Sequence, residues 1–474
     1  MIKKYILSFL IASSLLGGCS KFIDVEPTHD LDGEKFFKNL DDIEYELVGT
    51  YARLRSTSWF GDDTNPFLSL PDMISDNLYE TIYSLRNFTT HIRWAITEDD
   101  TRITNVWTAG YNVILNANIV LTKIESLASE NPERANRLKA QAYVLRAMAH
   151  FDLMRYFADN YDRNSTALGV PYTKSIDKFN KPPRITVKDD YDMIYADLNE
   201  AMNLFQNMDR DINVGGGRAF IDEFVAKALL ARISLYNKSY VDAINYATDV
   251  IDEFPIANRA TYPQIWTDAT LNEVIWSYTF NAGEGRIAGN IYWAPNDRLS
   301  FTVSKALEAT YDKVNDIRYS TFYIENYRPN VTGFKKHLAK QAMITKPDGV
   351  VNYKVFRTSE MYLIRAEAKL KQPTPDPAGA LDDLDEVRMA RINGFTSGGE
   401  TGAALEDAIA LERRKELIAE GHRFFDLKRT VRTINRDNCS VACTLASNNR
   451  AWTWPIPTAE ILANPNIGNQ NPGY

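Results

Sequence analysis

The sequence predicts a mostly α-helical fold built from helical hairpins, with an irregular, loop-rich portion and little β-structure. Apolar residues recur at three- and four-residue steps along much of the chain, which is the period of amphipathic helices. Strand-like alternation is rare: 274–280 is the best short candidate and 350–356 a weaker one. The segment from about 255 to 357 is rich in Gly, Asn, Pro, Tyr and Trp and mostly lacks helical period, and 56–95 shares this character.

The predicted helices include 140–157 (AQAYVLRAMAHFDLMRYF) and the segments near 104–127, 188–206, 219–236, 240–253, 358–371, 378–391 and 404–420. Two helix pairs share a further spacing. Ala231 and Ala243 lie twelve residues apart, with Ala247 following, and Ala368 and Ala380 repeat the step. Small residues at these steps let antiparallel helices approach closely, as in tetratricopeptide repeats. The match is partial, so plain helical hairpins are the alternative.

Composition narrows the function classes. The chain has 474 residues, a formal net charge of −8, 45% apolar residues and 24% charged residues, which is typical of a globular protein. An acidic balance without a basic block argues against nucleic-acid binding. With 5 His and 3 Cys there are few metal ligands, and no phosphate loop or nucleophile elbow occurs, so we expect no metal and no cofactor. The 12% aromatic content favours flat, sugar-like or peptide-like ligands.

The N-terminus has the pattern of a secretion signal. Lys3 and Lys4 precede an apolar run from Tyr5 to Leu16, which is too short to span a membrane. The run ends in Leu-Gly-Gly-Cys, which resembles a bacterial lipobox. Residues 1–18 are then a signal peptide, and Cys19 becomes a lipidated (palmitate-type) N-terminus and the only membrane anchor. The alternatives are a plain signal peptide with an incidental Cys, or a short buried helix.

Cys439 and Cys443 are the remaining cysteines. Outside the cytoplasm, two thiols this close in sequence favour a local disulfide. A free pair is the alternative. A zinc site is a further one, although it needs two more ligands and His422 is the one nearby candidate.

Several motifs occur in a fixed order along the chain. They are Asp76-Asn77, Leu145-Arg146-Ala147, RTSEMYLIRAEA at 357–368, ERRKELIAEGHRFFDLKR at 412–429, Trp454-Pro455-Ile456-Pro457 and QNPGY at 470–474. Together with the lipobox they resemble the SusD/RagB family, the surface nutrient-binding lipoproteins of Bacteroidetes. The resemblance spans nearly the whole mature chain.

The resemblance implies a SusD-like fold: a single globular unit over 19–474, with tetratricopeptide-like hairpins to about 255 and a loop-rich insertion and helical part from about 256. It also implies a non-catalytic protein, lipid-anchored in the outer membrane and facing the cell exterior. Such a protein captures oligosaccharides, or in some cases peptides, and passes them to a SusC-like TonB-dependent transporter. Glycan is favoured over peptide. A surface glycoside hydrolase and a purely architectural repeat protein are the rival classes.

Three glutamates, Glu412, Glu416 and Glu420, lie four residues apart and are expected on one helix face. Paired carboxylates are typical of glycosidases. Here, however, basic residues surround the acids and would keep them ionised. The pattern therefore predicts an ion-pair network that ties this helix to Arg388 or Arg391, and no catalytic residue.

Sugar recognition needs exposed rings and planar polar side chains. Such residues occur in both irregular segments, each with a structural role as the alternative. The candidates for ligand binding are Tyr83, Arg86, Trp94, Tyr292, Trp293 and Asn296, with Trp94 and Trp293 favoured.

Overall fold

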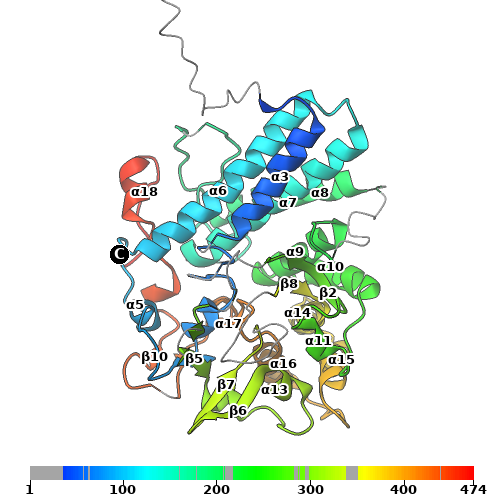
Figure 1. Ribbon diagram of the computed structural model, residues 1–474, viewed down its shortest axis with the longest axis vertical. Helices are drawn as coiled ribbons and strands as arrows, with labels where there is room; N and C mark the ends of the chain where they lie inside the picture. Colours follow the sequence, from blue (N-terminus) through cyan, green and yellow to red (C-terminus); the bar gives the residue numbers. More distant parts are fainter. Residues whose placement is uncertain are drawn as a thin grey trace, which may run out of the picture.

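The structure is a computed structural model (Figure 1) that describes residues 36–56, 58–61, 64–159, 161–177, 179–206, 208, 217–281, 287, 289–293, 298–337, 351–437 and 439–474. The predicted signal peptide, Cys19 and Asn296 lie outside these residues. The backbone of Tyr292 and Trp293 is described, but their side chains are not.

One group of long helices packs around α7 (Figure 1). It comprises α3 (Leu40–Leu54), α6 (Thr101–Lys123), α7 (Pro132–Phe157) and α8 (Val187–Phe205). Helix α7 is buried along almost its whole second half, where alanines let its neighbours approach closely. The sequence prediction missed α3, although its buried face repeats at helical steps: Leu40, Ile43, Leu47, Tyr51 and Leu54.

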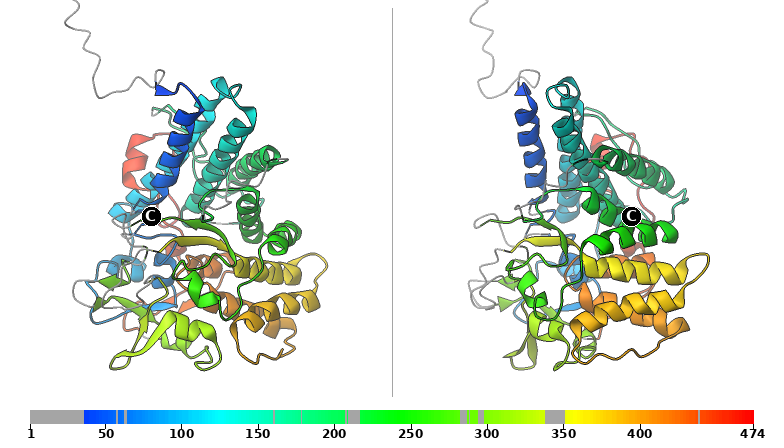
Figure 2. Two further views of the ribbon diagram at one scale, coloured as in Figure 1. Left: turned by 45° about the vertical axis from the view of Figure 1, so that its right-hand side comes forward. Right: turned by 90° about the vertical axis from the view of Figure 1, so that its right-hand side faces the viewer.

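A second group stacks as antiparallel hairpins (Figure 2, right). It comprises α9 (Glu223–Tyr236), α10 (Tyr240–Glu253), α14 (Thr358–Lys371), α15 (Pro377–Arg391) and α16 (Gly402–Glu416). The alanines of the twelve-residue spacing are fully buried. The predicted mostly α-helical fold of hairpins is therefore confirmed.

The described strands are short and form five two-stranded antiparallel sheets. The pairs are β1 (Leu78–Glu80) with β5 (Phe301–Val303), β2 (Val274–Tyr278) with β8 (Tyr353–Arg357), β3 (Tyr292–Trp293) with β4 (Arg298–Leu299), β6 (Tyr323–Arg328) with β7 (Val331–Phe334), and β9 (Ile434–Asn435) with β10 (Thr444–Leu445). Both predicted strands exist, and they pair with each other as β2 and β8.

Short helices complete the described elements: α4 (Leu70–Met73), α5 (Thr89–Ile92), η2 (Ile124–Ser126), α11 (Tyr262–Ile265), α12 (Lys305–Glu308), α13 (Ile317–Phe322), α17 (Arg423–Arg429), η6 (Arg450–Trp452) and α18 (Thr458–Ala463). One hydrophobic core extends from Leu40 to Ile467 and includes both helix groups. A small second cluster lies between α14, α15 and α16.

A buried network of charges joins α16 to its neighbours. Glu416 is fully buried among three buried arginines: Arg318 at 3.1 Å, Arg357 at 2.9 Å and Arg391 at 3.1 Å. Burial alone would raise the pKa of Glu416, but these cations hold that pKa well below its ordinary value. Because Glu416 contacts Arg391 as predicted, the expected structural ion-pair network is confirmed.

Helix α16 ends four residues earlier than predicted. Ala419 (φ +54°) and Gly421 (φ +82°) turn the chain in left-handed conformations. A Cβ at position 421 would lie 2.0 Å from the Phe67 carbonyl oxygen, so only glycine fits there. The turn brings Glu420 within 2.7 Å of Arg357. Glu420 thus joins the network from beyond the helix and not from the predicted helix face.

Candidate functional site

A hollow of about 140 Å³ lies between the β1–α5 segment and the loop that follows β9. We call it the loop hollow. Its lining residues are Leu78, Tyr79, Glu80, Arg86, Thr89, Ile92, Arg93, Arg436, Cys439, Ser440 and Val441. The first seven come from the irregular segment 56–95, in which the sequence predicts ligand contacts. Helix α5 and strand β10 lie side by side in Figure 1 at this place.

The Asp76-Asn77 motif fixes the start of β1. The Asp76 carboxylate accepts hydrogen bonds from Arg423 at 2.7 and 2.8 Å. The Asn77 side chain accepts one from Arg414 at 2.7 Å, and its backbone oxygen accepts one from Ser304 at 2.8 Å. Two arginines of the 412–429 motif therefore position the strand that forms one wall of the loop hollow.

Opposite charges meet on this wall. The Glu80 carboxylate forms an ion pair with Arg86 and accepts a hydrogen bond from the Ser84 hydroxyl at 2.6 Å. Arg86 has a left-handed backbone (φ +62°) and keeps about half of its side chain exposed. Thr89, at the start of α5, donates its hydroxyl proton to the Arg86 carbonyl at 2.8 Å. The predicted ligand residue Arg86 therefore lines the loop hollow with a guanidinium that solvent reaches.

The predicted ligand residue Tyr83 lies next to this wall. It is half-buried, and the Arg328 guanidinium at the end of β6 lies 4.7 Å from its ring centroid. The aromatic residue that lines the loop hollow is instead Tyr79, on β1 opposite Thr302 of β5. The same loop exposes two apolar side chains, Ile82 and Leu85.

Trp94 packs against Arg436, a residue that lines the loop hollow. Its backbone is left-handed (φ +55°), and its indole N–H donates to the Ile74 carbonyl at 2.9 Å. One ring face lies 4.0 Å from the Arg436 guanidinium, which lines the loop hollow. Trp94 stays a predicted ligand residue, with its N–H and one face already engaged by the protein.

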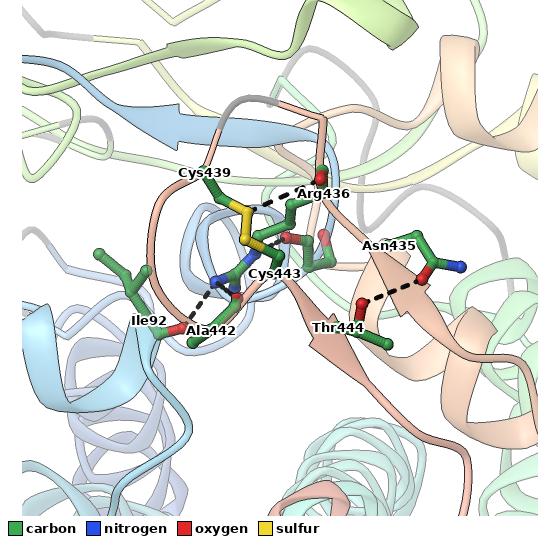
Figure 3. Close-up of a disulfide and its surroundings, with 8 residues drawn as sticks. Ile92, Asn435, Arg436, Cys439, Ala442, Cys443 and Thr444 are labelled. Carbon is green, nitrogen blue, oxygen red and sulfur yellow. Dashed lines mark hydrogen bonds between the residues drawn. A yellow bond between two sulfur atoms is a disulfide. The ribbon is translucent and has the colours of Figure 1, made fainter.

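The second wall is a disulfide-closed loop (Figure 3). Cys439 and Cys443 form a disulfide at the tip of the β9–β10 hairpin, which is the pairing that the sequence favours. The Arg436 backbone N–H donates to the Cys443 carbonyl at 2.9 Å and closes the loop base. Ser440 and Val441, at the exposed tip, line the loop hollow.

Arg436 joins the two walls. Figure 3 shows its side chain pointing toward Ile92, and its guanidinium donates to the carbonyls of Ile92 (2.7 Å), Ile74 (2.8 Å) and Ser75 (2.8 Å). Burial lowers the pKa of Arg436 to about 10, so the group stays positive at neutral pH. The sequence prediction missed Arg436, Arg93, Thr89 and Ser440. The neighbouring cysteine pair was the one available signal.

In the second predicted loop, the structure describes the backbone of Tyr292 and Trp293. Strand β3 pairs Tyr292 with Leu299 and Trp293 with Arg298 of β4. Just before it, the Asn290 side chain accepts a hydrogen bond from the Ser69 hydroxyl at 2.8 Å. Trp293, Tyr292 and Asn296 therefore stay predictions.

A larger cavity of about 620 Å³, here called the C-terminal cavity, lies among the ends of α7, α9 and α17 and the chain end. Trp452, Tyr161 and Tyr236 lie in its wall, and each ring is almost completely buried. The charged groups there pair within the protein: Lys238 lies 2.5 Å from Asp162. Its rings therefore have little exposed face for a ligand.

Within the described ranges, no three His, Cys, Asp or Glu side chains gather in a way that suits a metal ion. In the same part of the chain, no helix combines the length and apolarity that crossing a membrane requires.

The fold and site define a protein of tetratricopeptide-like helical hairpins with a loop-built surface hollow. A family model described as "Starch-binding associating with outer membrane" matches residues 21–235, and one described as "SusD family" matches residues 248–474. The chain belongs to the SusD/RagB family.

Individual SusD-like proteins and solved structures are similar to this chain over most of its length. SusD-like protein P38 of Formosa agariphila is 24% identical, with 91% of this chain and 92% of the relative covered. Among solved structures, a SusD superfamily protein from Bacteroides thetaiotaomicron is 26% identical, with a TM-score of 0.79, and 92% of this chain and all of that chain are covered. A putative sugar-binding protein from Bacteroides vulgatus is 25% identical, with a TM-score of 0.79, and 93% and 99% of the chains are covered.

Proposed function

We propose that this chain is a non-catalytic, surface-exposed lipoprotein that binds oligosaccharides at the loop hollow and passes them to a SusC-like TonB-dependent transporter. The observation that carries this proposal is the composition of the loop hollow in a SusD-family fold. Tyr79, Glu80 and Arg86 line one small surface site.

The chemistry of the loop hollow suits a hydroxyl-rich ligand. Arg86 and Glu80 pair with each other, while Arg93 and Arg436 leave the lining with an excess of positive charge. Planar guanidinium and carboxylate groups hydrogen-bond pairs of hydroxyls, and a tyrosine ring packs on the apolar face of a sugar. Exposed Ser440 and half-buried Thr89 add hydroxyl groups on opposite walls. The site therefore favours a saccharide.

The residues that line the loop hollow do not suit glycoside hydrolysis. That reaction uses two carboxylates about 5–9.5 Å apart on either side of the bond. Glu80 is the single carboxylate among the described residues that line the loop hollow, and Arg86 pairs with it. We therefore expect oligosaccharides incubated with the protein to keep their chain length, as measured by mass spectrometry. Shortened products would establish the hydrolase class instead.

Replacing Tyr79 with Ala is expected to weaken oligosaccharide binding about five- to 150-fold, because a ring-to-sugar stack contributes about 1–3 kcal/mol. Calorimetric titration against a panel of oligosaccharides measures the change. Tyr79→Phe is the matched control, because it keeps the ring and should keep most of the affinity.

Three further variants test where the oligosaccharide binds. Arg86→Ala should weaken binding, and Trp293→Ala tests the second predicted loop. Ser447→Trp fills the C-terminal cavity and should leave affinity unchanged. Normal binding by Tyr79→Ala together with loss in Ser447→Trp would move the site to the C-terminal cavity. A protein that binds peptides and no saccharide in the same panel would favour the peptide-binding alternative.

Cys19→Ala is expected to release the protein from washed outer membranes when the transporter is deleted, and to leave part of it membrane-bound when the transporter is present. Lipidation at Cys19 explains the first result, and docking on the transporter barrel explains the second. Immunoblotting of membrane fractions measures both. Retention without the transporter would contradict the single anchor, and complete release with it would contradict a stable complex.

A further inference from the structure

We infer that Arg436 is the positioning residue of the loop hollow, and that Arg436 and the Cys439–Cys443 disulfide together hold its two walls in the geometry that binds ligand. This inference rests on the proposed function, because it concerns the same site. It assigns a role to two features of the lining that hold other residues in place.

The Arg436 guanidinium donates hydrogen bonds to four backbone carbonyls. Its Nη2 and Nε donate to the carbonyls of Ile74 and Ser75, just before β1. Its Nη1 donates to the carbonyl of Ile92, at the end of α5, and at 3.3 Å to that of Ala442, inside the disulfide loop. One guanidinium therefore joins both ends of the first wall to the second wall.

The surroundings of residue 436 suit an arginine and not a lysine. The partners of the guanidinium are backbone carbonyls in several directions, and Trp94 covers one of its faces at 4.0 Å. A planar fork with five donors satisfies such a set, whereas the single ammonium of a lysine does not. The cation is buried enough to lower its pKa to about 10, so its hydrogen bonds are shielded from competing water.

The Cys439–Cys443 disulfide restrains the second wall of the loop hollow. The hairpin register pairs Thr444 with Asn435 and Leu445 with Ile434, which sets Arg436 and Cys443 at the loop base. The disulfide then closes the five residues 439–443 into a ring that includes Ser440 and Val441. Asp437 fastens the other side, because its carboxylate accepts a hydrogen bond from the Ala306 N–H at 2.6 Å. A loop restrained in this way does not have to be ordered when ligand binds, which favours affinity.

We expect changes in the disulfide loop to affect ligand binding and not the folding of the helical hairpins. Ser440 and Val441 are exposed, and none of the described residues between Ile434 and Leu445 belongs to the large hydrophobic core. Opening the loop should therefore alter the site and leave the helical hairpins intact. This differs from the charges around Glu416, which are buried between several elements of the fold.

Four variants test the inference: Arg436→Lys, the double variant Cys439→Ser/Cys443→Ser, their combination, and Arg432→Lys as a control on a partly exposed arginine nearby. We expect Arg436→Lys and the double cysteine variant each to weaken binding of the panel oligosaccharide about tenfold, by calorimetry. The combination should cost less than the product of the two, because both act on one loop. Arg432→Lys should bind normally.

Hydrogen exchange supplies a readout without ligand. In Arg436→Lys, amides of 74–94 should exchange faster, while those of α7 and α14 and the melting temperature stay unchanged. Unchanged affinity in both the Arg436 and the cysteine variants would overturn the inference, as would a fall in affinity that tracks a global loss of stability. If the unmodified protein binds no panel member, the proposed function fails, and unchanged exchange at 74–94 separately overturns the positioning role.

Discussion

Replacing Glu416 with Ala is expected to lower the free energy of unfolding by about 3–5 kcal/mol, because it leaves buried cations without their shared counterion. The Glu416 carboxylate is fully buried and contacts Arg318, Arg357 and Arg391 within 3.1 Å. Without it, Glu273 remains as a buried partner of Arg357 and Arg391, so two cations keep part of their pairing. Urea unfolding followed by circular dichroism measures the loss.

Glu406 provides the matched control on the same helix. It pairs with Lys371 at 2.6 Å, and both side chains are more than one-third exposed. Because exposed pairs contribute about 0–1 kcal/mol, Glu406→Ala should change stability little. Equal losses in the two variants would contradict the view that the 412–420 motif is structural and that burial gives it its weight.

Replacing Trp454 with Ala is expected to cost about 3–5 kcal/mol of stability, as large-to-small changes at buried aromatic positions do. Trp454 is 1% exposed and stacks on Tyr156 of α7, with ring centroids 3.8 Å apart. Its backbone N–H also donates to the Tyr156 carbonyl at 2.8 Å. The substitution opens a cavity where the C-terminal segment meets the central helix.

Leu462→Ala, on α18 after the same Trp-Pro-Ile-Pro motif, is the control. Leu462 is 80% exposed, so its truncation should change stability by at most about 0.5 kcal/mol. Thermal melts of both variants make the comparison. A Trp454→Ala protein as stable as the control would show that the motif does not anchor the chain end.

Local sequence patterns were enough to predict most of the long helices, although α3 was missed. Periodicity located α10, α14 and the end of α7 closely, because an apolar face at helical spacing has to be buried, but α7 begins eight residues before the predicted start. The end of α16 was misplaced because the turn depends on Gly421 lying against the Phe67 carbonyl, a contact between residues far apart in sequence. Such a contact has no local signal.

The candidate site was predictable only in part, for the same reason. The irregular segment 56–95 and the cysteine pair were visible in the sequence, but their meeting depends on hydrogen bonds from Arg436 to residues more than 340 positions away. Sequence also could not distinguish Tyr79, a residue that lines the loop hollow, from Trp94, whose ring packs against Arg436. Both rings lie in the same polar, non-helical segment.

The most direct test of oligosaccharide binding at the loop hollow is a crystal structure of the mature chain with a bound oligosaccharide from the calorimetric panel. We expect the sugar between β1 and the disulfide loop, with one face on the Tyr79 ring and hydroxyls hydrogen-bonded to Arg86. A sugar bound in the C-terminal cavity beside Trp452, with the loop hollow holding none, would contradict the proposed site.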